Sequence, residues 1–170
     1  MSQQDKFAET VFWDKVAKQR VYAAFDNEEY EALISAVWEA DMSGLTVADI
    51  GSASGVSAAL FAARGAKVLG IEIAPELVAQ AKELWRDYTE RIDFRVGDAE
   101  HLDLPDASLD AVFFGGVLHH IPLLDQVYAE AFRLTITEAL CWNKCLEKWI
   151  RVTSVLAITV HGDSFSPHKG

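Results

Sequence analysis

Three short groups of residues, each at the end of a predicted strand, have the types and spacing that bind a nucleoside. The segment DIGSASG (49–55) follows an apolar run, and its glycines let the backbone approach a ligand closely. Glu72 ends the next run, where a carboxylate can accept two hydrogen bonds from a ribose diol. Asp98 ends the third, where it could accept a hydrogen bond from an adenine amino group while the backbone beside Ala99 reads a ring nitrogen.

Each group also has a plainer interpretation. The small-residue segment could be only a tight strand-to-helix turn, Glu72 a solvated acid at a strand tip, and Asp98 a cap of the following loop. The loop and Glu72 together, at their spacing, favour a bound nucleoside over these alternatives.

The chemistry of the loop indicates which nucleoside. A dinucleotide site usually has the pattern G-x-G-x-x-G, but here Ala53 and Gly55 break the spacing and Val56 stands where a glycine is expected. Asp49 precedes the loop and would repel a pyrophosphate, whereas an ammonium and a sulfonium would tolerate a carboxylate. The loop therefore favours S-adenosylmethionine (SAM), and a nicotinamide-dependent oxidoreductase is the weaker alternative.

The elements that must position these groups alternate between helix and strand. Apolar periodicity predicts strands at 45–50, 67–73, 91–96 and 109–114, and helices at 5–22, 28–40, 55–64, from Pro75 onward, and from Pro122 to about Thr135. Such alternation is typical of a parallel sheet with helices on both faces, in which ligands bind beyond the carboxyl ends of the strands. The expected fold is an α/β three-layer Rossmann-like sandwich with a mostly parallel sheet of about five strands.

The first predicted helix, at 5–22, has one apolar face. Its apolar residues at helical spacing predict an inward face, formed by Phe7, Val11, Phe12, Val16 and Ala17. Aromatic residues of this segment that could contact a bound substrate, or else belong to the core, are Phe12, Trp13 and Tyr22.

His119 and His120 follow the fourth predicted strand. Because histidine titrates near neutral pH, one of them could act as a general base on an acceptor hydroxyl, and otherwise one serves as a hydrogen-bonded residue at a helix start. The catalytic residue stays unknown, with these two as weak candidates. Neither these histidines nor Cys141 and Cys145 come with the further ligands that a metal site needs.

Composition limits the classes of partner. The 170 residues suit one domain, and 15 Lys and Arg against 26 Asp and Glu give a net charge of −11. Nucleic acid and membrane are therefore not expected as partners. The start of the chain has no apolar signal region, so the cytoplasm is the expected location.

Residues 45–133 resemble the core of class I SAM-dependent methyltransferases, close to the small-molecule type of ubiquinone and menaquinone biosynthesis. The matching segments are VADIGSASG, VLGIEIAPELVAQAKE, IDFRVGDAEHLDLPDASLDAVFF and GGVLHHI, in family order; FWDKVAKQ resembles the family's N-terminal helix, which covers the cofactor. The resemblance implies methyl transfer from SAM to a small-molecule acceptor. The cofactor-binding residues that it implies are Asp49, Gly51, Ser52, Ala53, Gly55, Glu72, Ile73, Asp98, Ala99, Gly115 and Val117.

After Arg133 the chain departs from the family, so its C-terminal strands are expected to be missing or replaced. Spacing predicts a helix at 138–151, and β-branched residues predict a replacement strand at 152–160. The expected organisation is N-terminal helices (1–44), a SAM-binding core (45–133) and an atypical end (134–170). An uncovered sheet edge suggests a homodimer, and the altered end keeps open a protein that binds SAM or S-adenosylhomocysteine without catalysis.

Overall fold

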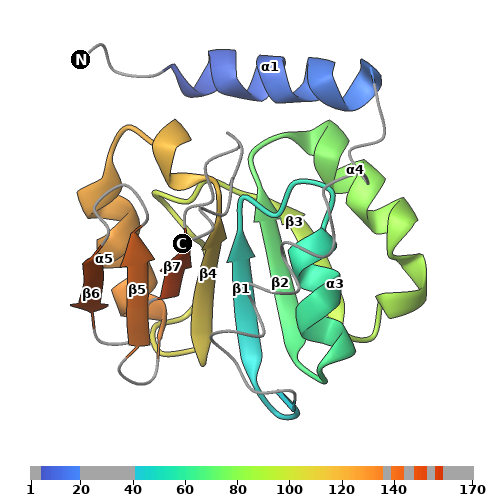
Figure 1. Ribbon diagram of the computed structural model, residues 1–170. Coiled ribbons are helices and arrows are strands. Elements are labelled where there is room, and N and C mark those ends of the chain that lie inside the picture. Colours follow the sequence, from blue (N-terminus) through green and yellow to red (C-terminus); the bar gives the residue numbers. More distant parts are fainter. Residues whose placement is uncertain (1–4, 20–40, 136–138, 144–147, 153–155, 159–170) are drawn as a thin grey trace, which may run out of the picture.

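The computed structural model describes residues 5–19, 41–135, 139–143, 148–152 and 156–158. Helices and 3-10 turns are α1 (Lys6–Gln19), α3 (Val56–Ala63), α4 (Pro75–Leu84), η1 (Arg86–Tyr88), η2 (Leu118–His120) and α5 (Leu124–Leu134). Strands are β1 (Thr46–Ile50), β2 (Lys67–Glu72), β3 (Ile92–Val96), β4 (Ala111–Gly115), β5 (Ala139–Asn143), β6 (Lys148–Val152) and β7 (Leu156–Ile158). They form one sheet of order β3-β2-β1-β4-β7-β5-β6 (Figure 1).

The centre of the sheet is parallel, as predicted. β1 pairs with β2 and β4, and β2 pairs with β3, all in parallel register. Since the chain runs from β1 outward to β3 and then returns to place β4 on the other side of β1, the strand order reverses between β1 and β4. That reversal opens a crevice at the carboxyl ends of these strands.

Helices cover both faces of the sheet and form two cores. Alternate strand residues, such as Val47 and Phe113, pack against α3 and α4 on one face. The residues between them, such as Ile50 and Phe114, pack against α5 on the other face. This alternation explains why the strands are apolar throughout, and it confirms the three-layer prediction.

The C-terminal part differs from its prediction. The helix predicted at 138–151 is wrong, because β5 and β6 form an antiparallel pair there. Short apolar runs rich in aromatic and β-branched residues satisfy helical spacing by chance and yet favour strands. The replacement strand is confirmed in part, since β7 pairs in parallel with β4 over Phe113↔Leu156 to Gly115↔Ile158. Within the described part of the chain the sheet thus has seven strands instead of about five.

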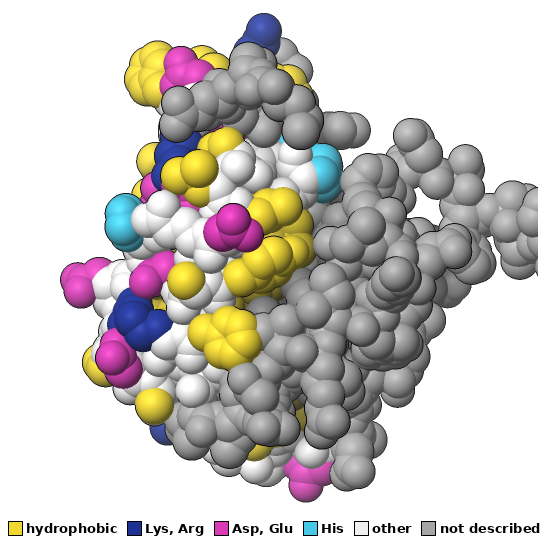
Figure 2. Space-filling model, turned by 90° about the vertical axis from the view of Figure 1, so that its left-hand side faces the viewer, with side chains coloured by type: hydrophobic (Ala, Val, Ile, Leu, Met, Phe, Trp, Pro, Cys, Tyr) yellow, Lys and Arg dark blue, Asp and Glu magenta, His cyan; other side chains and the backbone are white. Residues whose placement is uncertain are grey.

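The first helix lies where it was predicted but with another face inward. α1 crosses above the carboxyl ends of the strands (Figure 1). Phe7 and Phe12 are 76% and 56% exposed, and Val11 is exposed too, so the predicted apolar face points outward, whereas Ala17 is buried. Figure 2 shows apolar side chains exposed at the top of the molecule, where α1 lies. Another set of apolar residues, Ala17 and Trp13, packs against Ala74 and Leu77, and polar contacts described below also hold the helix.

The helix predicted at 28–40, Tyr22 and Cys145 lie outside the described residues. Among the residues that are described, no helix is long and apolar enough to cross a membrane.

Candidate functional site

A cavity of about 330 Å³ lies at the carboxyl ends of β1, β2, β3 and β4, with α1 as its roof. This volume falls within the usual range of small-molecule sites. The sequence-predicted residues that line it are Gly51, Ser52, Ala53, Glu72, Ile73, Asp98, Ala99, Gly115, Val117, His119 and His120. Asp49 and Gly55 are not in its lining.

The loop between β1 and α3 turns tightly because three of its residues, Gly51, Ala53 and Gly55, have positive φ angles. Gly51 has φ +72°, and a side chain there would place its Cβ 2.5 Å from Val117. Ala53 takes φ 45° although it carries a Cβ. The amides of Gly51 and Ser52 both donate to the carbonyl of Ile71, at 2.8 and 3.1 Å. These N–H groups are thus already used within the protein and do not face a ligand.

Asp49 is buried beneath this loop. Its Oδ2 accepts a 2.6 Å hydrogen bond from Ser57 Oγ, and its Oδ1 has no hydrogen-bond partner among the described residues. Burial raises the pKa of Asp49 to about 7, against hydrogen bonds from Ser57 and the Ala58 amide that lower it. The carboxyl therefore occupies the N-terminus of α3, the position at which a dinucleotide pyrophosphate would rest. A cationic ligand group would suit this end of the cavity.

Glu72 ends β2 and faces the cavity while only 7% exposed. Its Oε2 accepts from the amide of Ala53 and its Oε1 from the amide of Ala74, each at 3.1 Å. Burial raises the pKa of Glu72, and these backbone hydrogen bonds oppose the rise. Each oxygen keeps a further lone pair, so the carboxylate can accept a pair of ligand hydroxyls.

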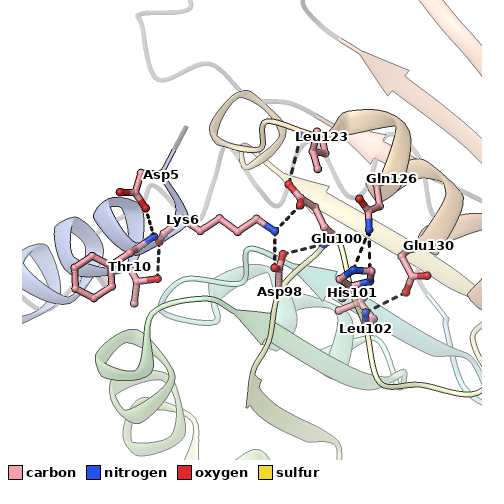
Figure 3. A network of polar contacts seen from close by, with 11 residues as sticks. Asp5, Lys6, Thr10, Asp98, Glu100, His101, Leu102, Leu123, Gln126 and Glu130 are labelled. Atoms are coloured by element: carbon pink, nitrogen blue, oxygen red, sulfur yellow. Dashed lines mark hydrogen bonds and ion pairs between the residues drawn. The ribbon is translucent and has the colours of Figure 1, made fainter. Parts of the chain in front are cut away.

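Asp98 and Glu100 form an acidic wall of the cavity, and only Asp98 of the two was predicted from the sequence. Lys6 reaches down from α1 to both carboxylates, at 2.6 Å from Asp98 Oδ2 and in contact with Glu100 Oε2 (Figure 3). Asp98 Oδ1 accepts from the Glu100 amide at 3.0 Å. Burial lowers the pKa of Lys6, but its hydrogen bonds to the two acids outweigh that effect and raise it.

Lys6, Glu9 and Glu100 were missed as site residues. Lys6 and Glu9 lie one turn apart on the inner face of α1 and both line the cavity. The signal that could have found them is their spacing, which places two charged side chains on one helix face. The predicted inward face was instead the one with the apolar residues, on the other side of the helix.

The histidines lie at the other side of the cavity. His119 and His120 belong to η2, with ring centroids 3.9 Å apart. His120 Nδ1 lies 3.6 Å from Glu9 Oε2. The edge of Trp13 meets the His120 ring, at a centroid distance of 5.4 Å. Of the aromatic residues expected near an acceptor, Trp13 lines the cavity whereas Phe12 faces solvent.

The donors and acceptors of this cavity fit SAM. Two buried oxygens, Asp49 Oδ1 and Ser52 Oγ, have no hydrogen-bond partner within the described part of the chain and await a donor. Glu72 offers acceptors for a diol, and Asp49, buried behind the cavity lining, offers its Oδ1 as an acceptor for the methionine end, directly or through water. Among the described residues no group of three or more His, Cys, Asp and Glu could hold a metal ion.

Comparisons with known proteins identify sequence relatives. The family profile described as "Methyltransferase domain" matches residues 48–142. The chain is similar to a ubiquinone biosynthesis O-methyltransferase of Xanthomonas axonopodis pv. citri, with 34% identity over 71% of this chain and 51% of that protein. It is also similar to an arsenite methyltransferase of Halobacterium salinarum, with 30% identity over 54% of this chain and 24% of that protein. The chain thus spans about half or less of the length of these relatives.

Solved structures show the same fold. The cyclase SpnF superimposes with a TM-score of 0.69 at 20% identity, over 82% of this chain and 60% of that one. Phosphoethanolamine N-methyltransferase 1 of Haemonchus contortus, solved with phosphoethanolamine and S-adenosylhomocysteine, gives a TM-score of 0.67 at 19% identity, over 82% and 32%. Because one neighbour is a cyclase, the fold alone does not specify the reaction.

Proposed function

Since the chain belongs to the methyltransferase-domain family, we propose that it transfers a methyl group from SAM to a small-molecule acceptor. The observation that carries the proposal is Glu72, a buried carboxylate at the tip of β2 that faces the cavity beside the small-residue loop. Methyltransferase names among its relatives support the reaction class.

The roles proposed for the cavity residues follow their chemistry. Glu72 holds the ribose hydroxyls with Ile73 beside it, and Asp98 with Ala99 reads the adenine. Asp49, behind the cavity lining, organises the methionine end, directly or through water. The remaining contacts to the methionine and ribose come from Gly51, Ser52, Ala53, Gly55, Gly115 and Val117. When bound, SAM supplies an electrophilic methyl group on a sulfonium.

The protein contributes mainly by positioning. Methyl transfer needs the acceptor atom held at about 3–3.5 Å from the methyl carbon, in line with the bond that breaks. The loop and β4 would fix the donor side, and α1 would close the cavity against water. No covalent step on a protein side chain is required.

The geometry disfavours the nicotinamide alternative. A pyrophosphate needs loop amides and a helix N-terminus. Here the amides of Gly51, Ser52 and Ala53 are bonded within the protein, and Asp49 occupies the start of α3. A second negative charge there would be repelled.

The acceptor, the location and the assembly remain proposals. The relatives' names give both an oxygen and an arsenite acceptor, so the names support only a small molecule. We propose a cytoplasmic protein that does not bind nucleic acid or membrane, and cell fractionation tests the location. Sedimentation velocity tests whether the chain forms a homodimer.

Calorimetry tests the proposed cofactor. S-adenosylhomocysteine should bind with micromolar affinity, and NAD should not bind. Glu72→Ala should weaken binding by about 1–3 kcal/mol, whereas Glu83→Ala, an exposed acid on α4 paired with Arg86, should not. Unchanged affinity in Glu72→Ala removes its assigned role, and tighter NAD binding overturns the proposal.

A second assay separates an enzyme from a protein that only binds. The protein is mixed with SAM carrying a labelled methyl group and with a metabolite extract. A labelled product supports methyl transfer. No labelled product from any extract, with S-adenosylhomocysteine still bound, favours binding without catalysis.

A further inference from the structure

Lys6 is the only lysine or arginine among the described residues that line the cavity. The same lining holds four acids, Glu9, Glu72, Asp98 and Glu100. The Lys6 ammonium lies between two of them, 2.6 Å from Asp98 Oδ2 and in contact with Glu100 Oε2 (Figure 3). A cation is therefore placed at the wall where the proposed function puts the adenine base.

Both oxygens of Asp98 already accept hydrogen bonds within the protein. Its Oδ1 accepts a 3.0 Å hydrogen bond from the amide of Glu100, and its Oδ2 accepts from Lys6. An ammonium and an adenine amino group are both donors, so they cannot bond to each other, and both need the same carboxylate. Lys6 thus competes with the base for Asp98.

Glu100 offers the ammonium a second partner. Its side chain is 3% exposed, against 35% for Asp98, and its Oε1 accepts from the amide of Leu123 at 3.3 Å. A buried carboxylate loses more than a half-exposed one when its cation leaves, because water does not replace the lost contact. Lys6 should therefore release Asp98 more readily than Glu100.

The ammonium can change partners without movement of α1. Lysine carries its charge on a flexible four-carbon stem, and the Lys6 side chain is 38% exposed. The helix is fastened at its other end, where Ala17 is buried and its carbonyl accepts from Gln80 Nε2. Asp14 also accepts a 3.1 Å hydrogen bond from the amide of Glu76. The roof of the cavity thus does not depend on which acid holds Lys6.

We propose that Lys6 determines which purine the cavity accepts and that Glu100 is the positioning residue of Lys6. The inference rests on the proposed function. When Glu100 holds the ammonium, Asp98 is open to the 6-amino group of adenine. When Asp98 holds it, the ammonium turns an N–H toward the base and suits a 6-oxo purine, whose oxygen is an acceptor. Selectivity for adenine therefore depends on where the ammonium lies.

Two ligands that differ only at this edge of the base test the inference. S-inosylhomocysteine is the analogue of S-adenosylhomocysteine with a 6-oxo group in place of the 6-amino group. Calorimetry measures S-adenosylhomocysteine directly and the analogue by displacement, and the quantity compared is the ratio of the two affinities. An altered roof, or the contact of the base with the backbone of Ala99, affects this ratio equally in all variants and cancels.

Two substitutions should move the ratio in opposite directions. Lys6→Met removes the competing donor and should raise the preference for S-adenosylhomocysteine about 3–10-fold. Glu100→Gln keeps the shape but leaves Lys6 to Asp98, so the preference should fall by a similar factor. In the double variant Glu100→Gln should add nothing to Lys6→Met. Lys18→Met and Glu83→Gln, whose residues do not line the cavity, are the matched controls and should keep the wild-type ratio.

A crystal structure with bound S-adenosylhomocysteine gives a readout that needs no variant. Lys6 Nζ should contact Glu100 and lie more than about 4 Å from Asp98, beyond the range of an ion pair. The adenine amino group should occupy Asp98 instead. If Lys6 stays bonded to Asp98 beside the bound adenine, the two donors share the carboxylate, and the competition is overturned.

The outcomes separate this inference from the proposed function. A ratio that is unchanged in Lys6→Met, or that moves the same way in Lys6→Met and Glu100→Gln, overturns the inference. Binding of S-adenosylhomocysteine by wild type leaves the proposed function standing in that case. Failure of wild type to bind S-adenosylhomocysteine overturns the proposed function itself.

Discussion

Replacing Asp49 by Asn should stabilise the ligand-free protein above neutral pH and leave its stability nearly unchanged in acid. The carboxyl is fully buried, with one oxygen bonded to Ser57 and the other without a partner. Its ionised form is therefore costly in the folded state, and burial raises the pKa of Asp49 to about 7.

The sign and size of the effect follow from proton linkage. Between the ordinary value of 3.8 and about 7, the folded state holds a proton on Asp49 that the unfolded state has lost. The free energy of unfolding of wild type therefore falls as the pH rises through this window. Above the window it stays lower by the same amount. At about 1.4 kcal/mol per pKa unit, the loss comes to about 4 kcal/mol. Asn has no such titration, so the free energy of unfolding of Asp49→Asn relative to wild type should rise by up to that amount.

Urea denaturation at pH 5, 6, 7 and 8 measures this difference. Other titrating groups are common to both proteins and cancel. Asp93→Asn is the matched control, since Asp93 is exposed and paired with Arg95, and its difference from wild type should stay small throughout. A difference between Asp49→Asn and wild type that does not change with pH would show that Asp49 is ionised in the folded protein already in acid, and the reasoning would be refuted.

Three further substitutions test the loop and the roof. Gly51→Ala should cost at least about 2 kcal/mol of stability in urea denaturation, because φ is +72° and the new Cβ meets Val117; a smaller loss means that the loop can move. Ala53→Gly should stabilise by about 0.5–1 kcal/mol, because φ 45° strains alanine; destabilisation would contradict that strain. Lys6→Met should speed hydrogen exchange of the α1 amides, whereas Lys15→Met, on the exposed side of α1, should not; equal rates would mean that the ion pairs do not hold α1.

The central sheet and much of the cavity could be predicted from sequence because local signals and global fold agree there. The apolar runs before Gly51 and up to Glu72 have no alternative to buried strands, and parallel strands bring their carboxyl ends together. The polar residues at the ends of these strands could therefore be assigned to one crevice from the sequence alone. The proposed contacts of Asp98 to adenine remain a prediction, and the structure adds Lys6 as a competitor for the same carboxylate.

The orientation of α1 could not be predicted, because it depends on partners distant in sequence. Lys6 faces inward toward the acidic residues that follow β3, and Glu9 faces inward toward His120. Periodicity alone cannot decide whether the charged face, with Lys6 and Glu9, or the apolar face, with Phe7 and Val11, is the buried face of the helix. Likewise the apolar residues of 138–151 fit both the helical and the strand period. The pairing of β5 with β6 shows that this segment belongs to the sheet.

The two amides on Glu72 have a consequence for the cost of binding. They come from Ala53, in the loop after β1, and from Ala74, at the start of α4, so a single carboxylate links two segments that also pack together in one apolar cluster. A nucleoside that arrives finds its acceptor already oriented, and little further ordering of the chain is required. The same residue thus preorganises the crevice before it binds anything.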